Sequence, residues 1–373
     1  MPLHSIRVLD LSRLLPGPYC SMLLADFGAE VIKIEEPNIG DYAREGLPKI
    51  DGVSALFHSL NRNKKSICLN LKAAEDKEQF LKLVKDSDVV IESFRPGVME
   101  RLGLDYETLK EINPGLIYCA ITGYGQDGPY ADLPGHDVNY ISYAGLLNMM
   151  GKRNGEPQIP ATQIADIGGG SYPAAVGILL ALFEREKTGI GQMVDISMMD
   201  GAISWMPTFL PNYLASEEQQ KRGELDLSGK LASYAVYETK DQKWLSVGAL
   251  EPKFWSEFCK TIGTEDFIHK LREPIDVQEQ MKEEIQRILL QKTSAEWMET
   301  FQKVNACVSP VQSFEEMVDD PQVKARGMIQ EISDSEFGTV RHIGIPIKLS
   351  DTPGKIRSVA PMLGEHTEEV LGE

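Results

Sequence analysis

The sequence predicts an α/β protein with a large Rossmann-like domain built on a parallel sheet and a smaller α+β domain. Through about the first 125 residues, short β-branched apolar runs alternate with helical patterns. These runs are apolar throughout, as in strands of a parallel sheet that helices cover on both faces. After residue 229 the sequence pattern changes to paired strands followed by amphipathic helices, which predicts the smaller domain.

The expected elements of the large domain follow one another in βα order. Strands are expected at 6–11, 29–35, 66–72, 88–94 and 116–124, and helices at 16–27, at 73–87 and in two short pieces within 95–113. A long loop is expected between the second and third strands. From Asp166 a glycine-rich start leads into a long apolar helix, for which Gly189 is the stop signal. Ligands of such folds bind beyond the carboxyl ends of the strands, so the loops after the strands are the places to search.

The predicted domain boundaries follow the composition. The large domain is expected over 1–210, a polar linker over 211–229 and the small domain over 230–325. Segment 326–373 is expected to return to the large domain as β hairpins and a short terminal helix.

Composition excludes several function classes. The chain has 373 residues, 42% of them hydrophobic and 25% charged, which is ordinary for a globular protein. Its formal charge of −18 repels nucleic acid and anionic membranes, so neither is expected as a partner. We find no long apolar run, secretory signal or peroxisomal tail, and the five cysteines lack CxxC spacing. A cytoplasmic protein with reduced thiols and no metal site is therefore expected.

Basic residues in this acidic chain are candidates for binding an anion. Arg62, Lys64 and Lys65 form a cluster, and Arg95 directly follows a predicted strand. The alternative for Arg95 is a surface arginine that caps a neighbouring helix.

Three further residues are candidates for acid/base chemistry. His136 lies between Gly135 and Asp137, and it is either a solvated loop residue or a proton carrier. Asp166 precedes three glycines and a long helix, so it is either an N-cap or a reactive carboxylate. Glu251 ends a predicted strand of the small domain, either as a solvated turn residue or as a carboxylate that orients a histidine.

Long collinear blocks make the whole chain resemble the family III CoA-transferases and their relatives, the α-methylacyl-CoA racemases. The blocks are LDLSRLLPGPYCSMLLADFGAEVIKIE, LNRNKKSICLNLK, ESFRPGVMERLGL, ITGYGQDGPY and ADIGGGSYPAAVGILLALFEREKTGIGQMVDISMMD. If the chain is a transferase, the resemblance implies that Asp166 attacks an acyl-CoA and forms a mixed anhydride. In the racemases, Asp166 and His136 act as two bases across the thioester's α-carbon, and Glu251 supports the histidine.

Two sequence features favour the racemase. The Gly-His-Asp-x-Asn-Tyr and Gly-Ala-x-Glu-Pro blocks are both present, and no glycine-run loop of the formyl-CoA transferase kind occurs near 225–260. The loop at 36–44 fits either chemistry, and a CoA-binding protein without catalysis is a third possibility.

The resemblance also implies how substrate and partner are bound. Coenzyme A is part of the substrate, and no separate cofactor is expected. The residues expected to bind the substrate or its phosphates are Arg62, Lys64, Lys65, Arg95, Gly135, Asp137 and Tyr140. An interlocked homodimer is implied, in which Glu251 would act in trans. The Met and aromatic residues of 198–214 suggest an acyl channel, although such residues more often form a core.

Overall fold

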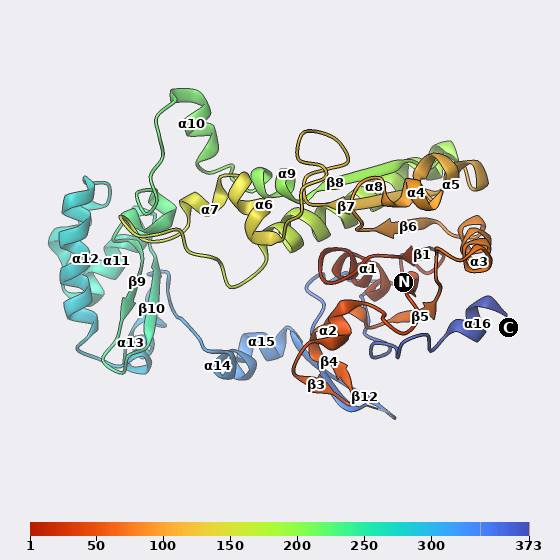
Figure 1. Ribbon diagram of the computed structural model, residues 1–373. Helices are drawn as coiled ribbons and strands as arrows, with labels where there is room; N and C mark the ends of the chain where they lie inside the picture. The colour runs from red at the N-terminus through yellow and green to blue at the C-terminus, as the bar shows by residue number, and fades with distance from the viewer. Residues whose placement is uncertain (336, 373) are drawn as a thin grey trace. The chain divides into compact units, whose positions relative to one another are not determined.

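The computed structural model describes residues 1–335 and 337–372, which form two compact units (Figure 1). The first unit contains residues 1–144, 161–205 and the chain from 321 onward, and the second contains 145–160 and 206–320. The chain thus leaves the first unit twice, and its C-terminal part returns there. The boundaries differ from the predicted ones, because residues 145–160 belong to the second unit. There the Arg222 guanidinium donates hydrogen bonds to the backbone oxygens of Asn148 and Gly155.

The first unit is built on a six-stranded parallel sheet with the order β5-β2-β1-β6-β7-β8. Its strands are β1 (Arg7–Asp10), β2 (Glu30–Glu35), β5 (Lys64–Cys68), β6 (Val89–Glu92), β7 (Ile117–Thr122) and β8 (Met193–Ser197). The chain starts at β1 in the middle, runs outward to β5, and then crosses back to β6 and outward again to β8. This is the strand order of a doubly wound Rossmann-like sheet, so the predicted fold class is confirmed.

Helices cover both faces of this sheet. Leu9 and Val90 are fully buried on one face, together with Phe80 and Val84 of α3 and Leu109 of α5. On the other face α1 contacts β1 and also α8, which packs on β7 and β8. The helices are α1 (Pro16–Asp26), α3 (Ala74–Lys85), α4 (Val98–Leu102), α5 (Tyr106–Ile112) and α8 (Tyr172–Thr188). Each fully buried side chain of this size stabilises the fold by about 1.5–3 kcal/mol.

The expected long loop between the second and third strands contains structure. It forms the 3-10 helix η1 (Tyr42–Glu45), the hairpin of β3 (Lys49–Ile50) and β4 (Val53–Ser54), and α2 (Ala55–Asn61). Ser54 caps α2 by accepting a hydrogen bond from the Phe57 backbone N–H. Phe57 packs with Val340 from the C-terminal hairpin of β12 (Ile329–Asp334) and β13 (Gly338–Ile343). The terminal helix α16 (Thr367–Leu371) lies beside β5 (Figure 1).

The second unit contains an antiparallel sheet of β9 (Tyr234–Glu238), β10 (Trp244–Gly248) and β11 (Val308–Pro310). Its core stacks the rings of Trp255, Phe258 and Phe301. The helices of this unit are α7 (Leu146–Met149), α10 (Leu210–Ser216), η3 (Asp226–Lys230), α11 (Pro252–Ile262), η4 (Glu265–Lys270), α12 (Ile275–Leu289), α13 (Ser294–Phe301) and α14 (Phe314–Asp319). The segment expected to be a linker thus contributes a helix, α10, to this unit.

One helical stretch of the described residues, Ile164–Thr188, is long and apolar enough to cross a membrane by length and composition alone. Half of its most apolar window is buried inside the protein. Core helices pass the same test, so this stretch is weak support for a membrane span.

Candidate active site

A cavity of about 560 Å³ lies at the carboxyl edge of the parallel sheet. Arg13 and Leu14 follow β1, Ser93 to Pro96 follow β6, and Thr122 ends β7. All of them line the cavity. It therefore spans the point between β1 and β6 where the strand order reverses, which is where ligands bind in doubly wound sheets.

His136 lines this cavity from the residue that precedes helix α6 (Asp137–Tyr143). Its backbone N–H donates a hydrogen bond of 3.0 Å to Oδ1 of Asn139, which fixes the start of the helix. The residue is exposed. The backbone at the start of α6 is thus held, and His136 is accessible from the cavity, as a proton carrier requires.

Asp166 lines the same cavity from the first turn of η2 (Ile164–Ser171), a π-helix that continues into α8. π-Helical turns are rare in proteins, and those that occur are often found at functional sites. The residue was expected to precede the helix, but the helix begins two residues earlier. Burial, and then the negative charge of Asp137, raise the pKa of the Asp166 carboxyl to about 7. The carboxyl can therefore donate or accept a proton near neutral pH.

The glycines after Asp166 allow a close helix contact. η2 packs against α9 (Met198–Ser204), and a Cβ on Gly169 would lie 2.6 Å from the Met198 carbonyl oxygen. Only a residue without a side chain fits there, so the glycine run serves the packing that supports the turn of Asp166.

Of three residues predicted to contact the substrate, two line the cavity and the third binds the backbone next to it. Gly135 and Tyr140 line the cavity, and the Tyr140 hydroxyl donates a hydrogen bond of 2.5 Å to the Gly135 carbonyl oxygen. A Cβ on Gly135 would lie 2.7 Å from the Tyr140 ring. The side chain of the third, Asp137, is buried and accepts hydrogen bonds from the backbone N–H groups of Ala165 and Asp166.

The predicted basic residues divide into two sets. Arg95 is exposed and lines the cavity. Arg62 and Lys64 are buried and engaged: Nη2 of Arg62 lies 2.7 Å from Asp26, and Nζ of Lys64 lies 3.1 Å from Asp10. In this arrangement neither can reach a phosphate.

Lys65 lies outside the cavity as well. Its half-buried Nζ forms ion pairs of 2.9 Å with Glu30 and 2.8 Å with Glu369. The three basic residues of this cluster thus form ion pairs within the protein, and we do not include them in the proposed site.

Sequence reasoning missed Arg13. It lines the cavity, and its Nη1 donates a hydrogen bond of 3.1 Å to the Tyr42 hydroxyl. The signal was available, because Arg13 follows the first strand closely, just as Arg95 follows the fourth. Arg13, Tyr42 and Phe94 also line a second cavity of about 300 Å³, which extends to Lys72. The two cavities thus share these three lining residues at the carboxyl edge.

The loop at 36–44 is held by buried ion pairs. Nη2 of Arg44 lies 2.6 Å from Glu35, and Nζ of Lys33 lies 2.9 Å from Asp41. The side chain of this loop that lines both cavities is Tyr42.

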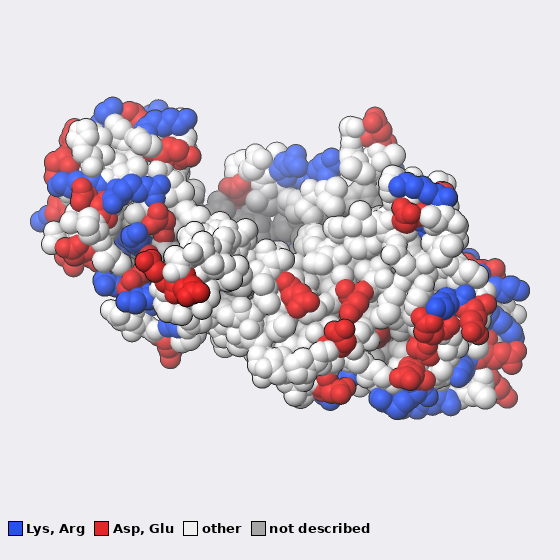
Figure 2. Space-filling model, turned by 90° about the horizontal axis from the view of Figure 1, so that it is seen from above, with Lys and Arg blue, Asp and Glu red and all other residues white. Residues whose placement is uncertain are grey.

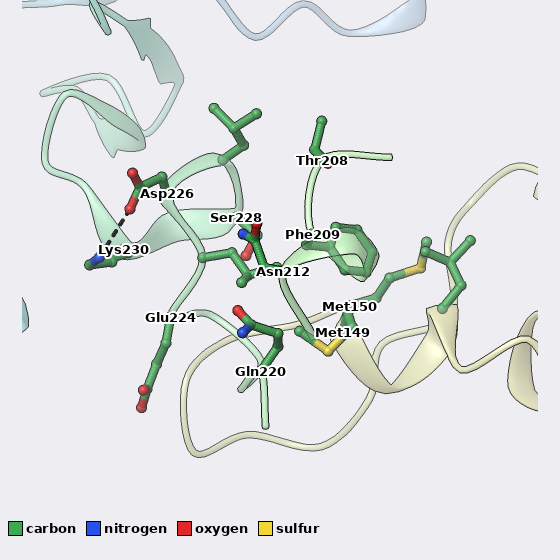
Figure 3. Close-up of a pocket in the computed structure, with 13 residues that line it drawn as sticks. Met149, Met150, Thr208, Phe209, Asn212, Gln220, Glu224, Asp226, Ser228 and Lys230 are labelled. Atoms are coloured by element: carbon green, nitrogen blue, oxygen red, sulfur yellow. Dashed lines mark hydrogen bonds and ion pairs between the residues drawn. The ribbon is translucent and has the colours of Figure 1, made fainter. Parts of the chain in front are cut away.

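Two predicted features involve the second unit. Glu251 precedes α11 there and is exposed. The segment suggested as an acyl channel divides: Met198 lines the cavity of the first unit, whereas Thr208, Phe209 and Asn212 line another cavity. That cavity of the second unit has a volume of about 470 Å³ and is also lined by Met149 and Met150 (Figure 3).

All five cysteines have free thiols. Within residues 1–335 and 337–372, no group of three or more His, Cys, Asp or Glu side chains is placed to hold a metal ion.

A two-domain α/β chain with a carboxylate and a histidine in one cavity can be compared with known proteins. Residues 3–367 match CoA-transferase family III, and the chain belongs to this enzyme family. It is 36% identical to the α-methylacyl-CoA racemase of Homo sapiens, with 100% of this chain and 93% of the relative covered. It is 34% identical to the succinyl-CoA–L-malate CoA-transferase β subunit of Chloroflexus aurantiacus, with 100% and 94% covered.

A solved structure supports the same assignment. The crystal structure of a CAIB/BAIF family protein from Brucella suis matches with a TM-score of 0.88 and 31% identity, and 100% of this chain and 99% of that chain are covered. The predicted family is thereby confirmed. Both racemases and CoA-transferases are among the relatives, so the family leaves the reaction open between the two.

Proposed function

We propose that this protein racemises 2-methylacyl-CoA thioesters by 1,1-proton transfer through an enolate, with His136 and Asp166 as the two acid/base groups. The observation that carries the proposal is that an exposed imidazole and a carboxyl with a pKa of about 7 line one cavity. A pair that exchanges protons needs a carboxyl whose proton affinity is close to that of an imidazole. An ordinary aspartate would stay ionised and could not return a proton.

The proposed reaction balances with one proton on the pair. When the Asp166 carboxylate removes the α-proton from one face, the electron pair passes to the thioester oxygen and an enolate forms. The His136 imidazolium then delivers its proton to the opposite face. In the reverse direction neutral His136 removes the proton and Asp166 delivers one, so the two groups titrate as a coupled unit.

The enolate oxygen needs donors that are already in place. The backbone N–H of Asp137 is the first of helix α6, and the first N–H groups of a helix have no intrahelical partner. We assign it as the candidate donor. Arg13 and Arg95 supply positive charge along the cavity edge for the phosphates of the CoA moiety, and charge-assisted contacts of this kind are the strong ones.

A second copy of the chain completes the proposed site. Val176, Leu180 and Phe183 of α8 are each more than half exposed, and apolar surface of this extent commonly marks an interface. In the proposed interlocked homodimer, the partner's Glu251 bonds the His136 ring and stabilises the imidazolium. Glu251 is exposed at the start of α11 and therefore available for such a contact.

The remaining expectations concern partners and location. On the face seen in Figure 2, acidic and basic side chains are interspersed rather than gathered into one basic field. This distribution and the charge of −18 fit a protein that binds no nucleic acid. We place the protein in the cytoplasm.

The second candidate function is an acyl-CoA:carboxylate CoA-transfer, in which Asp166 is the nucleophile. Relatives that are CoA-transferases favour it, at identities close to that of the racemase. In this reaction the carboxylate attacks the thioester carbonyl, CoA thiolate leaves, and a mixed anhydride forms. His136 would then be dispensable for the chemistry.

Proton NMR of a chiral 2-methylacyl-CoA in heavy water separates the two functions. Loss of the α-proton signal together with loss of optical purity is the expected result. Retention of both, with a new thioester on addition of a free carboxylic acid and an acyl-enzyme that hydroxylamine traps at Asp166, would instead establish the transferase.

A further inference from the structure

The carboxylate of Asp137 joins two elements that are far apart in the sequence. Its Oδ1 accepts a hydrogen bond of 2.6 Å from the Ala165 backbone N–H and one of 3.0 Å from the Asp166 backbone N–H. Asp137 itself is the first residue of α6 and directly follows His136. One side chain thus connects the backbone beside the histidine to the backbone of the aspartate.

These two hydrogen bonds have a clear structural reason. Ala165 and Asp166 are in the first turn of η2, where backbone N–H groups have no partner within the helix. Ala165 is fully buried and Asp137 is only 8% exposed, so water competes little for these bonds. A buried carboxylate that accepts two N–H groups is strongly fixed, because unmaking the bonds would leave buried polar groups unsatisfied.

We propose that Asp137 is a positioning residue, whose carboxylate holds the backbone of Asp166 against the helix that begins beside His136. The proposal rests on the proposed function only in treating His136 and Asp166 as an acid/base pair. A side chain adjacent to one base that bonds the backbone of the other fixes the separation of the two. Displacements of about 1 Å at such a site can reduce a rate by 10²-fold.

The same carboxylate acts on the charge of Asp166. After burial, the negative charge of Asp137 is the second cause that raises the pKa of Asp166. Charged or titratable groups that line the same cavity include Arg13, Tyr42, Arg95, His136 and Tyr140, and burial and then the charge of Asp166 raise the pKa of Tyr140. Positioning and charge can be separated, because Asn in place of Asp137 keeps an acceptor oxygen but carries no charge.

The test compares Asp137→Asn with Asp137→Ala and follows the titration of Asp166 by carbon-13 NMR of aspartate carboxyls. The Asp166 signal is identified by its absence from Asp166→Asn. In Asp137→Asn we expect the Asp166 midpoint to fall by roughly one pH unit, since a like charge has been removed. The α-proton exchange rate at its optimum pH should fall far less than in Asp137→Ala, because the acceptor oxygen is kept, and its acid limb should move to lower pH.

Asp137→Ala should lose the two hydrogen bonds as well as the charge. We expect its exchange rate at the optimum pH to fall by about 100-fold, with the same direction of shift in the Asp166 midpoint. The matched control is Asp241→Asn in the second unit, where Oδ1 of Asp241 accepts a 3.0 Å hydrogen bond from the Ser294 backbone N–H. That variant should alter neither the titration nor the pH profile.

Two outcomes would overturn the proposal. One is an Asp166 midpoint that is unchanged in Asp137→Asn, and the other is an Asp137→Ala protein as active as Asp137→Asn. The titration does not depend on turnover, so it separates this proposal from the proposed function. A shifted midpoint in a protein that exchanges no α-proton would contradict the racemase and leave the effect of Asp137 on the charge of Asp166 standing.

Discussion

Two pairs of basic residues lie at opposite edges of the parallel sheet of the first unit. Arg62 and Lys64 come at the start of β5, at its amino end, whereas Arg13 and Arg95 come after β1 and β6, at their carboxyl ends. The first pair is buried in ion pairs with Asp26 and Asp10, and the second lines the cavity. In this parallel sheet, the end of the strand at which a charge lies thus separates a structural role from the proposed ligand-binding one.

The largest effect is expected from the residues of the cavity that carry the proposed chemistry. His136→Ala and Asp166→Asn should each lower the racemisation rate by about 10²–10⁴-fold, because each removes one general acid/base. Both variants should remain folded, since both residues face the cavity. Polarimetry with circular dichroism on the same samples measures rate and fold together, and an active His136→Ala protein would contradict the two-base assignment.

The next largest effect is expected at the amino edge and concerns stability. Arg62→Met should lower the free energy of unfolding by about 3–5 kcal/mol, because Asp26 is left as a buried charge without its partner. The double variant Arg62→Met with Asp26→Leu should recover much of this loss. Urea denaturation measures both. Lys65→Met is the matched control, since its half-exposed pairs contribute less than about 1 kcal/mol.

Loss of a cation at the carboxyl edge should change substrate binding rather than stability. Arg95→Met should raise KM for the acyl-CoA by about tenfold, as expected for loss of one charge-assisted contact to a phosphate. Its urea midpoint should match the wild type, because Arg95 is exposed. Steady-state kinetics that show an unchanged KM would remove Arg95 from the binding site and reduce the contrast between the two edges.

The smallest effect expected is a pH dependence of stability at the cavity. Folding raises the pKa of Asp166 from 3.8 to about 7, so its contribution to stability is present at low pH and is lost as pH rises through 7. Asp166→Asn should therefore gain about 1 kcal/mol over the wild type between pH 5.5 and pH 8.5, a figure reduced for partial solvent screening. Urea denaturation at the two pH values checks this, and a constant difference would show that the pKa is not raised.

The sequence was sufficient for the fold, because strands such as β6 and β7 are short apolar runs separated by helices with clear stop signals. It also indicated His136, Asp166 and Arg95, each near a predicted strand end or helix start. It did not indicate that Arg62 and Lys64 are buried, since their partners Asp26 and Asp10 are distant in sequence and meet them only in the folded sheet. Helix α2 was missed because its hydrophobic partners come from the C-terminal hairpin.

The most direct test of the central claim is stereospecific exchange by the two single-base variants in heavy water. With one base removed, the other should still exchange the α-proton that faces it. His136→Ala should wash deuterium into one enantiomer of a 2-methylacyl-CoA, and Asp166→Asn into the opposite one, with racemisation lost in both. Exchange of both enantiomers by either variant, or of neither by both, would contradict a pair of bases acting on opposite faces of the α-carbon.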